Sequence, residues 1–430
     1  MSEHIVVVGG GAGGLELVVK LAKKTRRDAS VEVTLVDRNP THIWKPLYHE
    51  VATGSLNSYH DEASYRMLAR KHRFSFALGR VSGISATDRS LRLDAVTDDM
   101  GSEIMRTRTI DYSSLVIAVG SQSNDFGIEG VREFSRALDS REEAERFHKN
   151  FAAALHRAHE SEDPGERLSI VIVGGGATGV ELAADMHNVV KRLSEYGFPG
   201  FSADRLDVNV IEAAPRLLPN LPARIGDSVR LELERLGVNV LTDTQVEKVR
   251  ETEVVTSDGQ VVPAHLSVWA AGVKAPDFLA ASGLSTDRLG RVEVDEMLQV
   301  KGHASLFAIG DCAACPLSNG IPVPPRAQAA HQMATVAARN VLASRSGKAL
   351  RPFVYRDFGS LVNLSSYSTI GNLMGNLVRG TVFVEGRVAR VVYLSLYRMH
   401  QAAVHGRFST LLIMLGDRIY KATRAEVKLH

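Results

Sequence analysis

Two short hydrophobic runs in this chain end directly in glycine-rich turns. The runs at 5–8 and 170–173 contain only isoleucine and valine, as expected of strands buried on both faces of a parallel sheet. The turns that follow, Gly9–Gly14 and Gly174–Gly179, each lead into a stretch whose apolar residues recur at helical spacing. The pattern therefore predicts two strand–turn–helix units of the same kind in different parts of the chain.

Each turn has glycine at the three fixed positions of the dinucleotide fingerprint G-x-G-x-x-G. These glycines are Gly9, Gly11 and Gly14 in the first turn and Gly174, Gly176 and Gly179 in the second. The first permits the tight turn, the second lets the backbone approach a pyrophosphate, and the third lets the helix pack closely on the strand. Free N–H groups at the positive end of the helix then hold the anion. One motif is weak evidence, but two indicate two bound dinucleotides, most simply to pass electrons between them.

An acidic residue follows the second predicted strand of each unit, where it can hold a ribose hydroxyl. It is Asp37 in the first unit and Glu212 in the second. Both lie farther from the glycines than the usual ~20 residues, and in the second unit an insert around 196–200 accounts for the extra length. The alternative for each is a solvated acid at a strand end. Glu212 favours NADH over NADPH because a carboxylate repels a 2′-phosphate, although Arg216 nearby weakens this argument.

Two further apolar runs end in residues that a dinucleotide can use. The run 115–119 ends in Gly120, and the run 306–309 ends in Gly310 and Asp311. An aspartate at such a strand end can bind a ribityl or pyrophosphate group through hydrogen bonds. Together these motifs resemble the two-dinucleotide-binding-domain flavoproteins related to glutathione reductase. The resemblance implies non-covalent FAD at the N-terminal fingerprint, a nicotinamide dinucleotide at the second, and a return of the chain to FAD at Asp311.

Length and composition place the chain among multidomain globular proteins. Its 430 residues are too many for one domain, and 44% of them are hydrophobic, which is enough to bury a large core. A net charge of only +2 gives no global basic field, so nucleic acid is not expected as a partner. Two cysteines, Cys312 and Cys315, cannot form a disulfide framework. Because the first strand begins at about residue 4, we expect no signal or transit peptide and a cytosol-facing chain; no apolar run is long enough to span a bilayer.

The expected fold is α/β, with two Rossmann-type dinucleotide-binding domains of the glutathione-reductase kind and a C-terminal membrane-anchoring region. A charged helix is expected at 141–160 and a turn at Pro164–Gly165, before the second fingerprint. Short antiparallel strands are expected within 75–118, and strands at 380–384 and 388–393. The FAD-binding domain would occupy 1–160 and 276–345, the NADH-binding domain 161–275, and a C-terminal domain with amphipathic anchor helices 346–430.

A flavin reduced by NADH needs an acceptor, and the segment 326–334 indicates one. Three alanines spaced three and four apart form a thin helix face that permits close approach of a flat ring. Gln328 and Gln332 share a face, and their amides can hydrogen-bond a quinone carbonyl without adding charge. Taken alone, a structural helix facing the flavin explains the pattern equally well. Redox duty for Cys312 and Cys315 is a weaker alternative, because they follow the Gly-Asp turn rather than face the flavin ring.

The segment 327–332 resembles the quinone-site motif Ala-Gln-x-Ala-x-Gln of type II NADH:quinone oxidoreductases, the non-proton-pumping respiratory NADH dehydrogenases. The segments 44–47, 54–56 and 269–273 resemble the same family, and the resemblance, of bacterial type, covers essentially the whole chain. It implies hydride transfer from NADH to FAD, followed by reduction of membrane ubiquinone or menaquinone.

The family resemblance also implies roles for particular residues. Gln328 and Gln332 would flank the quinone head, and Glu181 would lie where nicotinamide and flavin meet. Gly272 belongs to the segment 269–273 and would contribute to cofactor binding.

Two kinds of residue in these motifs have plain structural explanations as well. His331 lies between the two glutamines and can change its charge near neutral pH, so it can help supply quinol protons, or it can be a structural histidine. Glu181, and Glu16 at the same offset in the first unit, can equally be acids favoured by the dipole of a first helical turn.

The C-terminal part combines apolar and basic residues in a way typical of interfacial helices. Apolar residues are frequent between 393 and 415, and acids are scarce, chiefly Asp417 and Glu426. We therefore expect peripheral attachment through anionic lipid to the cytoplasmic face of the cell inner membrane. The alternative is a helix packed on its own core or on a second subunit, and the family resemblance implies a homodimer. The basic residues are Arg390, Arg398, Arg407, Arg418, Lys421, Arg424 and Lys428.

Three other functions share this fold. A ferredoxin or rubredoxin reductase does not explain the basic, apolar C-terminus. A sulfide:quinone oxidoreductase needs thiols at the flavin, and an NADH-dependent sensor resembling apoptosis-inducing factor would turn over slowly. His42, His49 and His60 fit no metal-ligand spacing, so we expect no metal site and place these histidines in a surface loop. The sequence leaves open which quinone is used.

Overall fold

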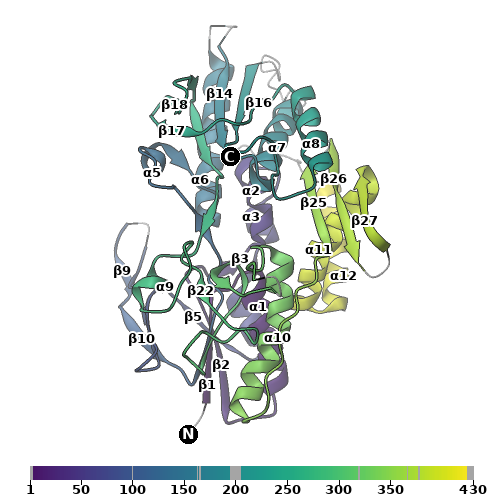
Figure 1. Ribbon diagram of the computed structural model, residues 1–430. Coiled ribbons are helices and arrows are strands. Elements are labelled where there is room, and N and C mark those ends of the chain that lie inside the picture. The colour runs from purple at the N-terminus through teal and green to yellow at the C-terminus, as the bar shows by residue number, and fades with distance from the viewer. Residues whose placement is uncertain are drawn as a thin grey trace.

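The computed structural model describes residues 3–98, 100–161, 163, 166–193, 205–317, 320–365, 367–375 and 378–423. Three features expected from the sequence lie outside these ranges: the insert around 196–200, the turn at Pro164–Gly165, and the charged residues Arg424, Glu426 and Lys428. The described part contains two five-stranded parallel sheets, which occupy the lower and upper halves of the molecule in Figure 1.

The first sheet is centred on the strand that precedes the first glycine-rich turn. Its order is β23 (Leu306–Ala308), β11 (Ser114–Ile117), β1 (Glu3–Val8), β2 (Val31–Asp37) and β5 (Ser75–Leu78), with all pairs parallel. Helices α1 (Ala12–Thr25) and α10 (Ala327–Arg345) pack against each other. The central strands are buried on both faces, which explains their unbroken runs of isoleucine and valine.

Four strands of the second sheet repeat this order around the second glycine-rich turn. The strands of the second sheet are β13 (Ser135–Arg136), β20 (Leu266–Trp269), β14 (Leu168–Val173), β15 (Leu206–Ile211) and β16 (Asn239–Leu241). Its edge strand β13 precedes the other four in the chain, whereas β23 follows the other strands of the first sheet. Helix α6 (Arg141–Glu160) begins at a capping box between Ser140 and Glu143, and its Phe147 and Phe151 lie in the core beside α7 (Ala177–Leu193). Helix α6, which ends at residue 160, therefore packs in the core of the second half.

The chain crosses between the two halves twice, and the crossings pair with each other. Strand β12 (Gln122–Ser123) on the outward path is antiparallel to β21 (Val273–Lys274) on the return. The antiparallel strands expected within 75–118 are present as β6 (Val81–Ser85), β7 (Ser90–Leu93) and β10 (Arg108–Asp111). The second half carries a similar small sheet of β17 (Val246–Val249), β18 (Glu253–Thr256) and β19 (Val261–Pro263).

The remaining elements before the C-terminal region are short, apart from two helices. The longer ones are α4 (Tyr65–His72) and α8 (Ala223–Arg235). The others are β3 (Thr41–His42), η1 (Lys45–Leu47), α2 (Tyr48–Thr53), α3 (Ser58–Asp61), β4 (Ala63–Ser64), β8 (Val96–Thr97), β9 (Glu103–Met105), α5 (Val131–Phe134), α9 (Phe278–Ala281), β22 (Val292–Glu293), η4 (Gly310–Cys312) and β24 (Ala313–Ala314).

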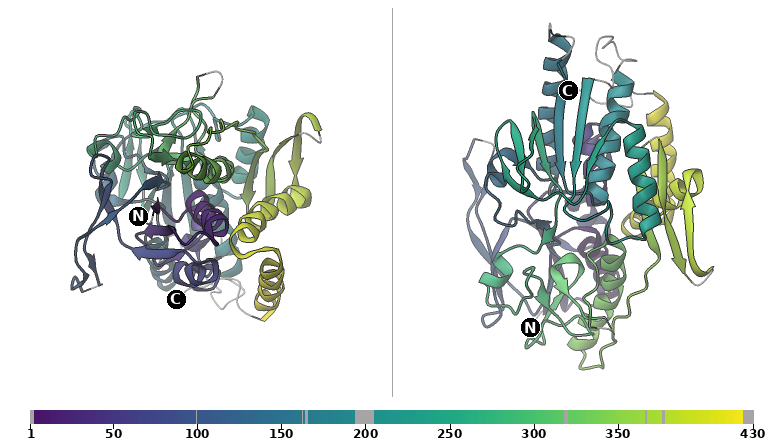
Figure 2. Two further views of the ribbon diagram at one scale, coloured as in Figure 1. Left: turned by 90° about the horizontal axis from the view of Figure 1, so that it is seen from below. Right: turned by 45° about the horizontal axis from the view of Figure 1, so that its top comes forward.

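The C-terminal region is an antiparallel sheet followed by two helices. The sheet contains β25 (Gly359–Leu364), β26 (Ser368–Gly375) and β27 (Val378–Glu385), and the helices are α11 (Gly386–His405) and α12 (Arg407–Thr423). The sheet packs on α7 and α8 of the second half, whereas α11 packs on α1 of the first. The region therefore runs along one flank and bridges both halves, as the views in Figures 1 and 2 show.

One strand expected in this region is wrong. The run 380–384 does lie in β27, but the run 388–393 lies in α11. Its β-branched residues suggest a strand, yet Ala389 and Tyr393 are buried four residues apart while Val391 is exposed. Burial at helical spacing against the sheet decides the conformation and overrides the local preference.

Candidate functional site

The first glycine-rich turn has the backbone geometry that the fingerprint requires. Gly9 has a φ of +97°, and a Cβ at Gly14 would lie 1.8 Å from the Gly9 carbonyl oxygen. The third glycine therefore lets α1 sit directly against the end of β1. A Cβ at Gly11 would meet no atom within 4 Å, and no side chain caps α1 there. The first N–H groups of α1 are thus available to an anion in front of Gly11.

The second turn repeats this geometry. Gly174 has a φ of +115°, and a Cβ at Gly179 would lie 2.0 Å from the Gly174 carbonyl oxygen. A Cβ at Gly176 would again meet nothing within 4 Å. Neither α1 nor α7 has an acidic residue in its first turn, so both helix ends suit a phosphate.

The two strand-end acids occupy equivalent places. Asp37 Oδ2 accepts the Gly10 N–H at 2.6 Å, and Glu212 Oε2 accepts the Gly175 N–H at 2.7 Å. In each case the second oxygen accepts a backbone N–H two residues onward, from Asn39 or from Ala214, at 2.8 Å. Burial raises the pKa of Asp37, and these N–H groups oppose the rise. Each carboxylate is therefore held against its glycine turn instead of extending into solvent, despite the long spacing in sequence.

The Gly-Asp turn after β23 meets the end of β11. The Ser121 hydroxyl, next to Gly120, donates to Asp311 Oδ2 at 2.9 Å, and Lys45 Nζ donates to the Ser121 carbonyl at 2.8 Å. A small cavity of about 50 Å³ lies beside this pair, and Arg291 is among its lining residues. Polar groups from three segments thus converge at the edge where the first sheet can receive a dinucleotide.

The small residues of α10 serve a close approach between backbones. A Cβ added at Gly13 would lie 3.1 Å from the Ala330 Cβ, and one added at Gly310 would lie 3.4 Å from the same atom. Gly310 N–H also faces Met333 Sδ at 3.2 Å. Ala330 therefore allows α10 to sit between the first fingerprint and the Gly-Asp turn, which places the start of α10 beside the first dinucleotide site.

The amides of Gln328 and Gln332 bind the segment that leads into the C-terminal sheet. Gln332 pairs with the backbone of Arg356 through both amide atoms, at 2.8 and 3.0 Å. Gln328 donates to the Gly359 carbonyl at 2.9 Å and accepts the Phe358 N–H at 3.1 Å. The sequence does not predict these partners, because they become neighbours only through the fold. Both amides anchor this segment to the first turns of α10.

Glu16 lies at the centre of a buried cluster. Its Oε2 is 2.6 Å from His331 Nδ1, and its Oε1 is 3.0 Å from His400 Nδ1 on α11. Lys20 contacts the same carboxylate at 3.0 Å, and His400 Nε2 lies 2.9 Å from His42 Nε2. Burial alone would raise the pKa of Glu16, yet hydrogen bonds from His331 and His400 and the charge of Lys20 lower it to about 2. Glu16 is therefore an ionised carboxylate although only 1% of its side chain is exposed.

Glu181 lies in a second buried cluster, where α7, α2 and β25 meet. Its Oε1 accepts the Asn363 N–H at 2.9 Å, and its Oε2 is 3.7 Å from His49 Nδ1. Burial raises the pKa of Glu181 well above its usual value, and Asp185 and Glu50 add to the rise. Burial also raises the pKa of Asp185 to about 7 and lowers that of His49. This cluster is therefore held largely in its neutral form at ordinary pH.

The prediction of surface histidines near residue 44 is wrong for two of the three. His42 and His49 are buried, at 7% and 2% exposure, and burial lowers the pKa of His42 to about 3. Trp44 stacks on His400 and on Tyr397, so the loop is covered by α11. The side chain of His60 lies outside what the structure describes. Among the described residues, no group of three His, Cys, Asp or Glu side chains has the geometry of a metal site.

Gly272 lies at the return crossing between the two halves. Its φ is +61°, and a Cβ there would come within 2.5 Å of the Phe126 ring. The neighbouring Trp269 donates its indole N–H to the Asn124 carbonyl at 2.8 Å. Packing against Phe126 therefore explains why glycine is needed at 272. This reason is separate from its expected proximity to the cofactors.

The two cysteines are buried and face backbone carbonyls. Cys312 Sγ lies 3.3 Å from the Ile309 carbonyl oxygen, and burial raises the pKa of Cys312 and of Cys315 to about 12 each. Thiols of this kind are unreactive at neutral pH, which agrees with a packing role.

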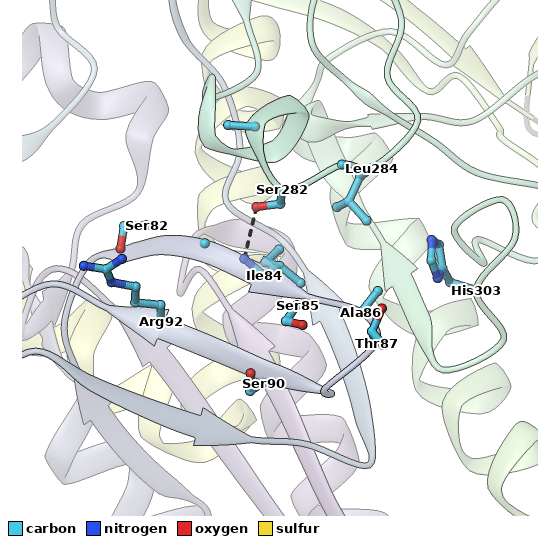
Figure 3. A pocket seen from close by; sticks show the side chains of 13 residues that line it. Ser82, Ile84, Ser85, Ala86, Thr87, Ser90, Arg92, Ser282, Leu284 and His303 are labelled. Atoms are coloured by element: carbon cyan, nitrogen blue, oxygen red, sulfur yellow. Dashed lines mark hydrogen bonds between the residues drawn. The ribbon is translucent and has the colours of Figure 1, made fainter.

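One hollow of the described surface is lined by no residue of either fingerprint. It measures about 500 Å³ and lies between the β6–β7 hairpin and α9, with Arg92, Ser282 and His303 among its lining residues (Figure 3). The Ser282 hydroxyl accepts the Ile84 N–H at 3.0 Å across it. None of the predicted site residues lines this hollow.

The outer faces of α11 and α12 expose large apolar side chains. Phe408 is 74% exposed. Arg398 is tied to Asp417 at 2.8 Å, whereas Arg390, Arg407 and Arg418 are exposed. In the described part of the chain no helix is long and apolar enough to cross a bilayer. The other exposed apolar residues are Val391, Leu394, Leu396, Met399, Leu411, Leu412, Met414, Leu415 and Ile419.

The chain matches the model of a known protein family and is similar to named relatives. Residues 3–334 match the model of the pyridine nucleotide-disulphide oxidoreductase family. The chain is 41% identical to a type II NADH:quinone oxidoreductase from Haemophilus influenzae, with all of both chains covered. It is 30% identical to a protein of the same name from Mycobacterium tuberculosis, covering 95% of this chain and 86% of the relative. The structure of NDH2 from Plasmodium falciparum in complex with NADH has the same fold, with a TM-score of 0.82, 19% identity and both chains fully covered.

Proposed function

The chain belongs to the type II NADH:quinone oxidoreductases, within the pyridine nucleotide-disulphide oxidoreductase family, and on this premise we propose how its residues carry out the reaction. It is an FAD-dependent enzyme that oxidises NADH and reduces quinone. The observation that carries the residue assignment is the placement of α10, whose Ala330 packs against both the first fingerprint and the Gly-Asp turn. This packing brings the half-exposed His331 next to the place of the first dinucleotide.

FAD fits the first half of the molecule. Gly9, Gly11 and Gly14 hold the pyrophosphate at the start of α1, Asp37 binds the adenosine ribose, and Asp311 with Gly120 receives the ribityl part. The open space in front of Gly11 and the convergent hydroxyl, carboxylate and ammonium groups near Asp311 support this assignment. FAD supplies the chemistry that accepts a hydride and passes on two electrons.

NADH occupies the second half, with its pyrophosphate at Gly174, Gly176 and Gly179 and its ribose on Glu212. Glu212 repels a 2′-phosphate, whereas Arg216 directs one guanidinium nitrogen to the Pro219 carbonyl at 2.9 Å. Gly272 belongs to the crossing that joins the two dinucleotide sites. Glu181 lies at the junction of α7, α2 and β25 and would present an uncharged carboxyl group where nicotinamide and flavin meet.

The quinone lies at the start of α10, where Gln328, Gln332 and His331 are close together. The glutamine amides shape this site chiefly by holding the segment 356–359. His331 is the proton donor to quinone, because its ring is 37% exposed while its Nδ1 is anchored on Glu16. The remaining ring nitrogen, Nε2, can then reach a substrate oxygen.

Turnover of His331→Gln tests the quinone site. With a short-chain quinone, kcat should fall about 10²-fold, because a positioned proton donor contributes that much or more. Turnover with ferricyanide, which accepts electrons without protons, should fall far less. His303→Gln, at the hollow beside α9, is the matched control. Equal quinone turnover in the His331 and His303 variants would remove His331 from the mechanism.

We further propose that α11 and α12 attach the enzyme to anionic lipid on the cytoplasmic face of the inner membrane, and that the enzyme is a homodimer. The support for attachment is the run of exposed apolar side chains beside the exposed Arg390, Arg407 and Arg418. The proposed domain division is FAD at 1–160 and 276–345, NADH at 161–275 and the anchor at 346–430, with α6 packed on the NADH side.

Replacing Phe408, Leu411 and Leu412 together by serine tests the membrane contact. Flotation with vesicles of phosphatidylglycerol and phosphatidylcholine should weaken at least about tenfold, since each exposed apolar side chain that enters lipid contributes on the order of 1 kcal/mol or more. Leu231→Ser on α8, where the side chain is 50% exposed, is the control. Undiminished flotation of the triple variant would place the contact elsewhere, and light scattering of the same samples reports the dimer.

A further inference from the structure

Four side chains from four elements form one continuous hydrogen-bonded row. His331 of α10 contacts Glu16 of α1 at 2.6 Å, Glu16 contacts His400 of α11 at 3.0 Å, and His400 contacts His42 of β3 at 2.9 Å. The row begins at a half-exposed ring and ends beside the first fingerprint, where a hydrogen bond joins His42 to the Gly10 backbone. The two middle residues of the row, Glu16 and His400, are 384 positions apart in the chain.

The ionised Glu16 carboxylate determines which ring nitrogens of the neighbouring histidines carry a proton. Glu16 is ionised, with a pKa of about 2, so its two oxygens only accept. The Nδ1 atoms of His331 and His400 must therefore both carry hydrogen. His42 is neutral, since burial lowers its pKa to about 3. The carboxylate thus fixes the His331 ring with Nδ1 inward and leaves Nε2 as the atom that exchanges its proton on the exposed side.

The groups that act directly on the Glu16 carboxylate lie on α1, α10 and α11. Lys20 of α1, His331 of α10 and His400 of α11 face it directly. His42 of β3 lies behind His400, and the charge of His405 acts on both of these histidines. A buried carboxylate needs partners of this kind to remain ionised, so His400 and Lys20 support the charge that His331 uses.

We propose that Glu16 and His400 are positioning residues for quinone reduction, and that they hold His331 in the orientation and charge state needed to donate a proton. This inference rests on the proposed role of His331. The overall reaction is NADH + H⁺ + quinone → NAD⁺ + quinol. In the step proposed, the N–H bond at His331 Nε2 breaks and an O–H bond forms on the quinone, while both electrons come from NADH through FAD. His331 regains its proton from solvent on its exposed side.

His400 belongs to α11, so the proton donor is assembled only when this helix is docked. Trp44 stacks on His400 with ring centroids 6.4 Å apart and on Tyr397 at 5.3 Å, which holds the helix in place. The C-terminal region therefore contributes to the reaction as well as to the proposed membrane contact. The motif at 327–332 contains no signal for this partnership, because His400 follows no recognisable pattern in the sequence.

The test compares pH profiles of turnover with a short-chain quinone and with ferricyanide, using the full-length FAD-loaded enzyme. In Glu16→Gln, the ratio of quinone to ferricyanide turnover should fall about tenfold or more at neutral pH. The pH above which quinone turnover declines should move down, because the variant no longer places a negative charge 2.6 Å from the His331 ring. The ferricyanide profile contains no such limb.

Two substitutions of His400 separate positioning from packing. Asparagine places an amide nitrogen near the Nδ1 position and can keep the hydrogen bond to Glu16, whereas glutamine places it near Nε2 and keeps only the bond to His42. Both variants lose the ring on Trp44, so packing damage is shared. His400→Gln should shift the quinone profile and His400→Asn should shift it less, while His303→Gln, at the hollow beside α9, should leave it in place.

The outcomes are distinct. Unshifted profiles in Glu16→Gln and His400→Gln, with His331→Gln still impaired, would overturn the positioning role and leave His331 as proton donor. An unimpaired His331→Gln would overturn both. Equal shifts in the two His400 variants, or equal losses with both acceptors, would assign His400 to structure alone. If Glu16→Gln failed to retain FAD, the His400 pair would still decide the question.

Discussion

Glu16 and Glu181 occupy equivalent positions in two similar halves, yet they differ in protonation state. Glu16 is ionised, whereas Glu181 is protonated. Each lies two residues after the third fingerprint glycine, and each is almost fully buried. The surroundings of Glu16, with Lys20 and two histidine N–H groups, lower its pKa to about 2. Around Glu181, burial dominates and two further carboxyl groups lie nearby, so its pKa rises well above the usual value.

The difference comes from the segments that the rest of the chain places on each helix. Helices α10 and α11 pack on α1 and place nitrogen donors next to Glu16. Helix α7 receives α2 and β25, which bring a neutral His49 and a single backbone N–H to Glu181. The same local motif therefore holds a charge in one half and a proton in the other, and tertiary neighbours decide which.

The largest effect is expected when the third fingerprint glycine of each half is replaced by alanine. This pair of substitutions tests whether the two turns have the same role in their own halves. Gly14→Ala and Gly179→Ala would each place a Cβ within about 2 Å of a carbonyl oxygen, at a cost of more than about 4 kcal/mol. Gly14→Ala should abolish FAD retention. Gly179→Ala should retain more FAD but lose NADH binding, as measured by flavin absorbance and NADH titration. Gly416→Ala, where an added Cβ meets nothing within 4 Å, is the control, and indistinguishable losses in both variants would mean that the halves do not fold separately.

The difference between the halves should appear directly when each buried carboxyl group is replaced by an amide. Glu16→Gln breaks a buried ion pair and should lower the free energy of unfolding by about 3–5 kcal/mol. Glu181→Gln resembles the protonated acid, keeps an oxygen for the Asn363 N–H, and should cost less than about 1 kcal/mol. Thermal unfolding at neutral pH measures both. Equal destabilisation would show that the two carboxyl groups share one charge state.

The pH dependence of stability should reveal the neutral cluster. Burial raises the pKa of Asp185 from 3.8 to about 7, so the folded state keeps a proton that the unfolded chain releases. Stability from this group is complete below pH 3.8 and is lost as pH rises through 7, by on the order of 4 kcal/mol in all. Asp185→Asn should therefore raise the melting temperature above pH 7 and leave it unchanged near pH 4. For Glu16 the sign is reversed, and its contribution is lost as pH falls from 4.5 toward 2.

The smallest effect is expected at the strand-end acids, where the halves are most alike. Glu212→Gln should reduce the preference for NADH over NADPH by about tenfold, because it removes the repulsion of a 2′-phosphate. Steady-state kinetics with the two nucleotides give the preference, and FAD content should be unaffected. Asp207→Asn, on the same strand at its other end, is the control. A preference that survives in Glu212→Gln would assign discrimination to other groups.

The features found from sequence are those encoded by local spacing. The two strand–turn–helix units, Asp37, Glu212 and the Gly-Asp turn depend on residues close together in the chain, and the parallel sheets place them as expected. Type II family membership was likewise indicated by short motifs and is confirmed by the relatives.

The features missed depend on contacts across the whole chain. The run 388–393 was expected as a strand, because its burial against the body at helical spacing is invisible locally. His42 and His49 were placed on the surface, since nothing nearby in sequence shows that α11 and α7 cover them. The sequence predicts that the amides of Gln328 and Gln332 bind a quinone carbonyl. In the folded chain they also form hydrogen bonds with the backbone of 356–359.

The strand order of the first sheet determines how late in translation this sheet can be completed. Its edge strand β23 begins at Leu306, whereas its neighbour β11 ends at Ile117, and the whole second sheet is encoded between them. At ~5–20 residues per second, a ribosome needs roughly 10–40 s to cover that interval. The nascent first half must wait through this time with an open sheet edge at β11, while the second half can already close. Asp311 emerges only afterwards, so the Gly-Asp turn that we propose for FAD can form only when more than two thirds of the 430 residues have been made.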